Sequence, residues 1–168
     1  KNTKIIHNFA FKCSKKKWKK FQEDSELYQI GEEAFYKTEI EKFDFPNKMK
    51  YVSLDIFKYC EKLREVIFSN SVELINPSKK VYLNIEKITI PPKVDNFDVI
   101  YALNKLTEIR ISPNNKYFSD LNGKIITKKS NPYNDSYDII YYVLPSIKHV
   151  FIPSYIKKIV PGIFSNMQ

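Results

Sequence analysis

The sequence predicts a solenoid, a fold in which short repeated units stack along one axis. Two observations predict it. The pattern apolar-x-x-apolar-x-apolar starts at intervals of 23, 22 and 21 residues through the middle of the 168-residue chain. A second pattern, an aliphatic residue followed five positions later by Phe, recurs between these copies and in phase with them. A unit this short cannot bury its apolar face alone, whereas stacked units share one continuous core.

The first pattern predicts one strand in each repeat, with parallel strands in register between neighbouring units. Proline follows several copies closely, for example Pro46 and Pro91, which is typical of a strand that ends there. In the second pattern, Gly31–Phe35 suits a short helical or 3₁₀ turn. The copies of the first pattern are Trp18–Glu23, which is weaker because it ends in Glu, and Ile40–Phe45, Leu63–Phe68, Ile85–Ile90, Leu106–Ile111 and Ile147–Ile152.

Residues 117–143 depart from the repeat and predict a β-hairpin insertion. Asn122-Gly123 lies between two apolar runs and indicates a type I′ turn, and Ile139–Val143 would supply a further strand. Two turns are also irregular. Asn76–Lys80 replaces the expected Phe turn of the fourth unit, and Phe97–Leu103 forms the irregular turn of the fifth.

The stretch LYQIGEEAFYKTEIEKFDFP, residues 27–46, and the stretch YVSLDIFKYCEKLREVIF, residues 51–68, resemble the BspA-type leucine-rich repeat. The usual unit of that family looks like L-x-x-I-x-I-P, a short turn and I-x-x-x-A-F-x-x-C. The resemblance implies a leucine-rich-repeat solenoid with a parallel β-sheet on its concave side and short helical or 3₁₀ turns and loops. It also implies a cell-surface or secreted protein, because members of the family look like surface proteins associated with adhesion and host contact.

We predict a single domain over residues 1–168. Its repeats would cover about 6–29, 30–51, 52–74, 75–96 and 97–116, followed by the insertion at 117–143 and a partial last repeat at 144–168. The last repeat lacks a following strand, so we expect either a longer natural chain or association end to end.

The x positions of the first pattern face outward and align into columns of mostly charged residues. Opposite charges on adjacent strands, about 4.8 Å apart, attract each other. The columns therefore either stabilise the stack by themselves or present a mixed-charge surface to a protein partner. The candidate binding residues are Glu41, Lys42, Asp44, Arg64, Glu65, Ile67, Glu86, Lys87, Thr89, Glu108, Arg110, Lys148, His149 and Phe151.

The formal net charge of +9 is concentrated at the start of the chain. Residues 1–20 hold eight Lys and no acid, whereas residues 21–168 hold 20 basic and 19 acidic residues. One hypothesis is that a basic patch here binds an anionic polymer, either a heparin-like glycan or nucleic acid. The other is that Trp18 packs in the first repeat and the lysines are solvated. The patch consists of Lys15, Lys16, Lys17, Trp18, Lys19 and Lys20.

The sequence offers little for catalysis or metal binding. It has two His, His7 and His149, and none of the common nucleophile, zinc-protease or phosphate-loop motifs. We predict no enzyme activity, no cofactor and no metal. Cys13 and Cys60 are expected at equivalent repeat positions as buried, unpaired thiols. No apolar run reaches the roughly 20 residues of a membrane span, and Asn134 begins a glycosylation sequon for a secreted protein.

The sequence therefore favours a non-catalytic module for protein binding or cell adhesion at a host or cell contact. The alternatives are the anionic-polymer site and a structural spacer that associates with itself.

Overall fold

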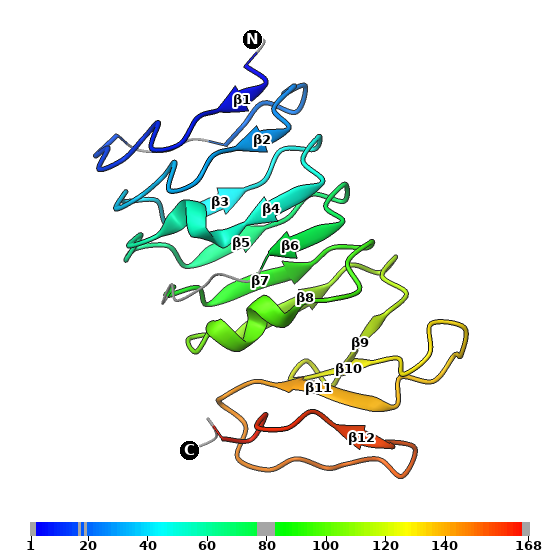
Figure 1. Ribbon diagram of the computed structural model, residues 1–168. Coiled ribbons are helices and arrows are strands. Elements are labelled where there is room, and N and C mark those ends of the chain that lie inside the picture. Colours follow the sequence, from blue (N-terminus) through cyan, green and yellow to red (C-terminus); the bar gives the residue numbers. More distant parts are fainter. Residues whose placement is uncertain (1–2, 17, 19, 77–82, 166–168) are drawn as a thin grey trace.

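The computed structural model describes residues 3–16, 18, 20–76 and 83–165, and it shows a solenoid (Figure 1). The chain winds from one end to the other in stacked turns, so sequence neighbours one repeat apart lie next to each other. The predicted fold class is confirmed. The strands are β1 (Ile5–Ile6), β2 (Gln29–Ile30), β3 (Lys42–Asp44), β4 (Tyr51–Ser53), β5 (Glu65–Ile67), β6 (Leu74–Asn76), β7 (Lys87–Ile90), β8 (Glu108–Ile111), β9 (Phe118–Leu121), β10 (Ile125–Lys128), β11 (Ile139–Val143) and β12 (Lys158–Ile159).

One side of the solenoid is a parallel sheet in the order β3-β5-β7-β8. Each of its strands comes from a central copy of the first sequence pattern. The pairing aligns equivalent positions without a shift, so Phe43 lies beside Val66 and Val66 beside Ile88. These inward residues are almost fully buried, whereas the residues between them face out.

The second pattern forms more regular structure than a turn alone. Its aliphatic residues lie in short strands, each just before a turn. These strands pair in parallel as β1-β2 and β4-β6 on the other side of the solenoid. The turns that follow include two 3₁₀ helices, η1 (Leu54–Phe57) and η2 (Asp98–Ala102). The hydroxyl of Ser53 caps η1 by accepting a hydrogen bond from the backbone N–H of Asp55.

Backbone hydrogen bonds also join the first three turns to one another on the Phe side. Phe11 donates to the carbonyl of Ala34 at 2.8 Å, and Phe35 donates to the carbonyl of Ile56 at 2.9 Å. The side chains of Phe11 and Phe35 stack with ring centroids 5.1 Å apart. Gly31 lies where the first turn passes closely, since a Cβ atom there would clash with the backbone of Asn8.

The core is an aromatic and aliphatic column that runs through the turns. Phe35, Phe43 and Phe57 are at most 1% exposed, and neighbouring rings contact each other edge to face or tilted. Pairs of this kind contribute about 0.5–1.5 kcal/mol beyond their buried area. The sheet thus depends on the Phe turns for its buried face.

The predicted hairpin insertion is confirmed. β9 pairs with β10 and β10 with β11, both antiparallel. Asn122 and Gly123 have φ of 62° and 71°, as a type I′ turn requires. β11 also pairs in parallel with β12, so the insertion joins the hairpin to the last turn of the solenoid.

The insertion is fixed to the repeats through Tyr141 of β11. Its hydroxyl donates to Asp98 at 2.6 Å and accepts from the backbone N–H of Phe97 at 3.2 Å. The hydroxyl of Tyr101 in η2 donates to the carbonyl of Tyr141 at 2.8 Å. Burial and the nearby Asp98 carboxylate raise the pKa of Tyr101 to about 12. The irregular fifth turn therefore serves as the contact surface for the hairpin.

The predicted strand at 147–152 is wrong, and no strand forms in the described part of 18–23. β8 is the last strand of its sheet, and β9 lies next to it. The last turn is also shorter than a regular one. Ile140 of β11 pairs with Ile159 as Ile6 pairs with Ile30, so Ile140 takes the place that Ile30 has in the second turn. Ile147 follows Ile140 by seven positions, whereas Ile40 follows Ile30 by ten. The insertion thus separates residues 147–152 from β8 and leaves Ile152 43% exposed.

Asp138 holds the base of the loop that precedes β11. Its carboxylate is 1% exposed and accepts from the Ser130 backbone N–H at 2.9 Å and the Ser130 hydroxyl at 2.8 Å. Lys157, from the last turn, lies 3.1 Å away. The hydrogen bonds from Ser130, followed by that from Lys157, lower the pKa of Asp138 to about 2. One buried carboxylate therefore ties the insertion to the turn after it.

We expect Asp138 to make stability depend on acid pH. Because its pKa is lower in the folded chain than in the unfolded one, its contribution is complete above about pH 4 and is lost as the pH falls toward 2. Asp138→Asn should lower the free energy of unfolding at neutral pH and flatten this acid dependence, measured by urea unfolding at a series of pH values. Asp135→Asn is the control, because that carboxylate is fully exposed. An equal flattening in both variants would contradict the assignment.

Candidate binding surface

The outward side of β3, β5, β7 and β8, with the residue preceding each strand, forms one continuous surface, which we call the ladder face. It contains eleven of the predicted binding residues at aligned positions, because the strands pair without a shift. Most are exposed or half-buried. They are Glu41, Lys42, Asp44, Arg64, Glu65, Ile67, Glu86, Lys87, Thr89, Glu108 and Arg110.

Ion pairs between neighbouring strands cross the ladder face. Their nitrogen–oxygen distances are 3.2 Å for Lys42–Glu65, 3.1 Å for Arg64–Glu86 and 3.3 Å for Lys87–Glu108. Arg110 adds a 2.6 Å contact to Glu108, and hydrogen bonds from Arg110 and then Lys87 lower the pKa of that carboxyl. The charged side chains are therefore paired along the sheet, although they are between a quarter and two thirds exposed.

The ladder face is hollowed over its first three strands. The hollow has a volume of about 450 Å³ and is open to solvent. Ile67 and Thr89 lie half-buried on the same face, in the column next to the ion pairs. Positively and negatively charged side chains thus surround a space large enough for side chains of a partner. The hollow is lined by Glu41, Lys42, Lys62, Arg64, Glu65, Glu86 and Lys87.

Lys148, His149 and Phe151 do not extend the ladder face, so this part of the prediction is wrong. The sheet ends at β8, and the insertion lies next to β8 where the aligned strand was expected. Phe151 is 83% exposed, in the last turn of the solenoid. The copy of the first pattern at residues 18–23, which precedes the ladder face, also forms no strand in its described part.

The basic patch is exposed at Lys15, Lys16 and Lys20, whereas Lys17 and Lys19 lie outside the described residues. Trp18 is half-buried and packs against the core. Its ring contacts four Phe rings at centroid distances between 4.8 and 5.7 Å, and its indole N–H is buried with no acceptor among the residues described. Trp18 thus packs against the Phe rings and does not project with the lysines, so the exposed side chains of the patch offer charge.

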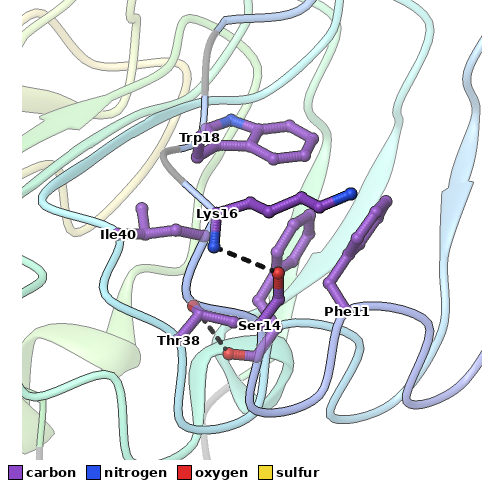
Figure 2. Close-up of a pocket in the computed structure, with 7 residues that line it drawn as sticks. Phe11, Ser14, Lys16, Trp18, Thr38 and Ile40 are labelled. Atoms are coloured by element: carbon purple, nitrogen blue, oxygen red, sulfur yellow. Dashed lines mark hydrogen bonds between the residues drawn. The ribbon is translucent and has the colours of Figure 1, made fainter.

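A pocket next to this patch was not predicted from the sequence. It has a volume of about 290 Å³ and lies between the first two turns (Figure 2). The signal was the unusual pair Ser14 and Trp18 at positions that hold Thr38 and Ile40 in the next turn. The lining residues are Phe11, Ser14, Lys16, Trp18, Phe35, Thr38 and Ile40.

The cysteines are not equivalent, which corrects the prediction that both are buried. Cys60 is 1% exposed, donates to the carbonyl of Phe35 at 2.9 Å and lies 3.3 Å from the hydroxyl of Thr38. Cys13 follows its Phe by two positions, one fewer than Cys60 does, and is exposed with φ of 57°. Ser14 occupies the position equivalent to Cys60.

Within the described ranges, no cluster of three or more His, Cys, Asp or Glu side chains has a geometry for a metal ion. In the same ranges no helix has the length and apolar character needed to cross a bilayer. Asn134 lies exposed in the loop between β10 and β11, where its backbone N–H donates to Asn131 at 3.1 Å. Its glycosylation stays a prediction.

The comparisons with known proteins agree with this geometry. A family model described as a BspA type leucine rich repeat region, in 6 copies, matches residues 1–104. The fold is similar to the pneumococcal vaccine antigen PcpA, with 24% identity, a TM-score of 0.71 and coverage of 96% of this chain and 40% of that one. It is also similar to a leucine rich cell surface protein of Faecalibacterium prausnitzii, with 19% identity, a TM-score of 0.61 and coverage of 91% and 40%. The chain thus spans about two fifths of these structures. No curated protein matches the sequence.

We expect the ladder ion pairs to be coupled in stability. Arg64→Glu should lower the free energy of unfolding, because it places a second negative charge beside Glu86, whereas Arg64→Glu combined with Glu86→Arg should restore most of the loss. Exposed cross-strand pairs contribute a few tenths to about 1 kcal/mol, so a double-mutant cycle by urea unfolding should give a coupling energy in that range. The coupling should shrink at high salt. Additive effects of the two substitutions would contradict it.

We expect one thiol of the native protein to react with a thiol reagent and the other to stay protected. Burial raises the pKa of the Cys60 thiol, and the thiolate is the reactive form. Cys13→Ser should therefore abolish the rapid reaction with a chromogenic disulfide, and Cys60→Ser should leave it unchanged. Both thiols should react after unfolding in urea. Rapid native reaction in the Cys13→Ser variant would refute the burial of Cys60.

Proposed function

We propose that this chain, which belongs to the BspA-type leucine-rich repeat family, is a non-catalytic binding module of a cell-surface or secreted protein. Its ladder face takes a protein partner at a host or cell contact. The observation that carries the proposal is the hollow on the ladder face, where seven charged side chains from consecutive strands surround an open space.

The ladder face suits a partner that presents both charges. Lys42, Arg64 and Lys87 each lie beside a carboxylate of the next strand, so a segment of alternating charge can bind alongside and share these contacts. Because the ion pairs already hold the side chains, less side-chain freedom is lost on binding. Charge complementarity of this kind contributes more to specificity and association rate than to affinity.

The surface location rests on the solved structures. One is described as a cell surface protein and the other as a vaccine antigen, and both contain a similar solenoid. A repeat scaffold exposes an extended face without any need for a catalytic cleft. These descriptions support the proposal of a module on the cell surface or in a secreted protein, where it would be available for adhesion.

Binding of an anionic polymer by the basic patch is the second candidate. The exposed Lys15, Lys16 and Lys20 favour it. Since Trp18 packs against the core Phe rings, this binding would be mainly electrostatic and would weaken steeply with salt.

The test is binding of the folded chain to immobilised extracellular-matrix proteins and to cultured cells. Lys87→Glu, in the middle of the ladder face, should weaken binding about tenfold, as removal of one partner of a charge pair at an interface does. Lys50→Glu is the matched control, because Lys50 forms a 3.4 Å pair with Glu73 beside β4 and β6 on the other side of the solenoid. It should leave binding unchanged.

Two results would overturn the proposal. Equal losses in the two variants would exclude the ladder face, and no binding to any matrix protein or cell would count against adhesion. Loss of binding only after neutralisation of Lys15, Lys16 and Lys20, together with elution at high salt, would favour the anionic polymer instead.

A further inference from the structure

The pocket between the first two turns has an apolar interior and a polar rim. Phe35, Thr38 and Ile40 form its floor and are at most 6% exposed, whereas Phe11 and Lys16 at the rim are exposed. Thr38 adds no free polar group to the floor, because its hydroxyl donates to the carbonyl of Phe35 at 2.9 Å. The walls are therefore almost entirely hydrocarbon.

The pocket results from two substitutions in the first turn relative to the second. Trp18 occupies the position of Ile40, but its ring packs toward Phe35 and Phe43, at 4.8 and 5.7 Å, and does not fill the space above Ile40. Ser14 occupies the position of Thr38 and has no methyl group. Its hydroxyl accepts from the backbone N–H of Lys16 at 3.3 Å, so it stays at the rim.

Lys16 supplies the charge at this pocket. Figure 2 shows its side chain running between Trp18 and Ser14, with the amino group directed toward Phe11. Lys16 forms no ion pair with any residue in the described part of the chain. An unpaired ammonium beside an apolar pocket recognises an anion that carries a hydrocarbon group.

We propose that this pocket binds a small apolar monocarboxylic acid, with its hydrocarbon part against Phe35 and Ile40 and its carboxylate on Lys16. The volume of about 290 Å³ suits one ring or branched chain and excludes a long acyl chain. Burial of the hydrocarbon supplies most of the binding energy, at about 25 cal/mol per Å². The charge selects acids over neutral molecules of the same shape. This site is separate from the ladder face and does not depend on its proposed partner.

Tryptophan fluorescence can be used to measure binding, because Trp18 is the only tryptophan of the sequence and lines the pocket. The probe is 3-cyclohexylpropanoate, which does not absorb with indole, and its amide is the neutral control. The acid should give a saturable change in tryptophan fluorescence in the millimolar range, as expected for a ligand of this size. The amide should bind about fivefold more weakly, since a half-exposed charge contact contributes up to about 1 kcal/mol.

Three variants locate the site. Lys16→Gln removes the charge, keeps the first half of the aliphatic stem and should weaken the acid about fivefold with little change for the amide. Lys15→Gln removes a neighbouring exposed charge and should have no effect. Ser14→Leu fills the pocket from its rim and should abolish saturation for both probes, with its thermal midpoint reported as the folding control.

The proposal fails if the acid causes no saturable change in fluorescence and no ligand-observed magnetisation transfer. It also fails if acid and amide bind equally, if Lys15→Gln weakens binding as much as Lys16→Gln, or if a folded Ser14→Leu variant still binds.

Discussion

The backbone hydrogen bonds between equivalent positions of neighbouring turns are the constraint on which the rest of the structure depends. Arg64 donates to Glu41 at 2.8 Å and Glu86 donates to Arg64 at 2.7 Å, and Phe11 and Phe35 continue the same arrangement on the Phe side. Because the regular turns repeat the positions of the last, side chains at equivalent positions lie above one another. The buried Phe column and the charged columns are both consequences of this register.

The spacing of apolar residues in the sequence predicts the features that follow from the alignment of neighbouring strands, and few others. Four strands of the ladder face follow from the spacing of apolar residues, and the alternating charges that pair across them follow from the same alignment. The hairpin was predictable because Asn122-Gly123 adopts positive φ at both residues. The short strands at β1, β2, β4 and β6 were not, because two or three paired residues leave too weak an alternation to detect.

The failures occur where a local count differs by a few residues. Cys13 lies one position early and turns outward, and Ser14, which is half-buried, then occupies the position that the buried Cys60 has in the third turn. The turn before Ile147 is three residues shorter than that before Ile40, and the insertion occupies the space beside β8. Pattern matching aligns such segments with the repeat, whereas packing decides whether they join it. The candidate site was therefore predicted over four strands and not at its two ends.

The contact of Tyr141 with Asp98 and Phe97 has a mechanical consequence for the chain under tension. The hydrogen bonds between turns lie along the solenoid axis. A pull applied at the two ends therefore loads them one turn at a time, and the stack opens stepwise. At the insertion, Tyr141 adds its hydrogen bonds with Asp98 and Phe97 to the pairing of the strands. Opening this junction therefore breaks side-chain and backbone hydrogen bonds together, and the same pull meets more bonds there than strand pairing alone supplies.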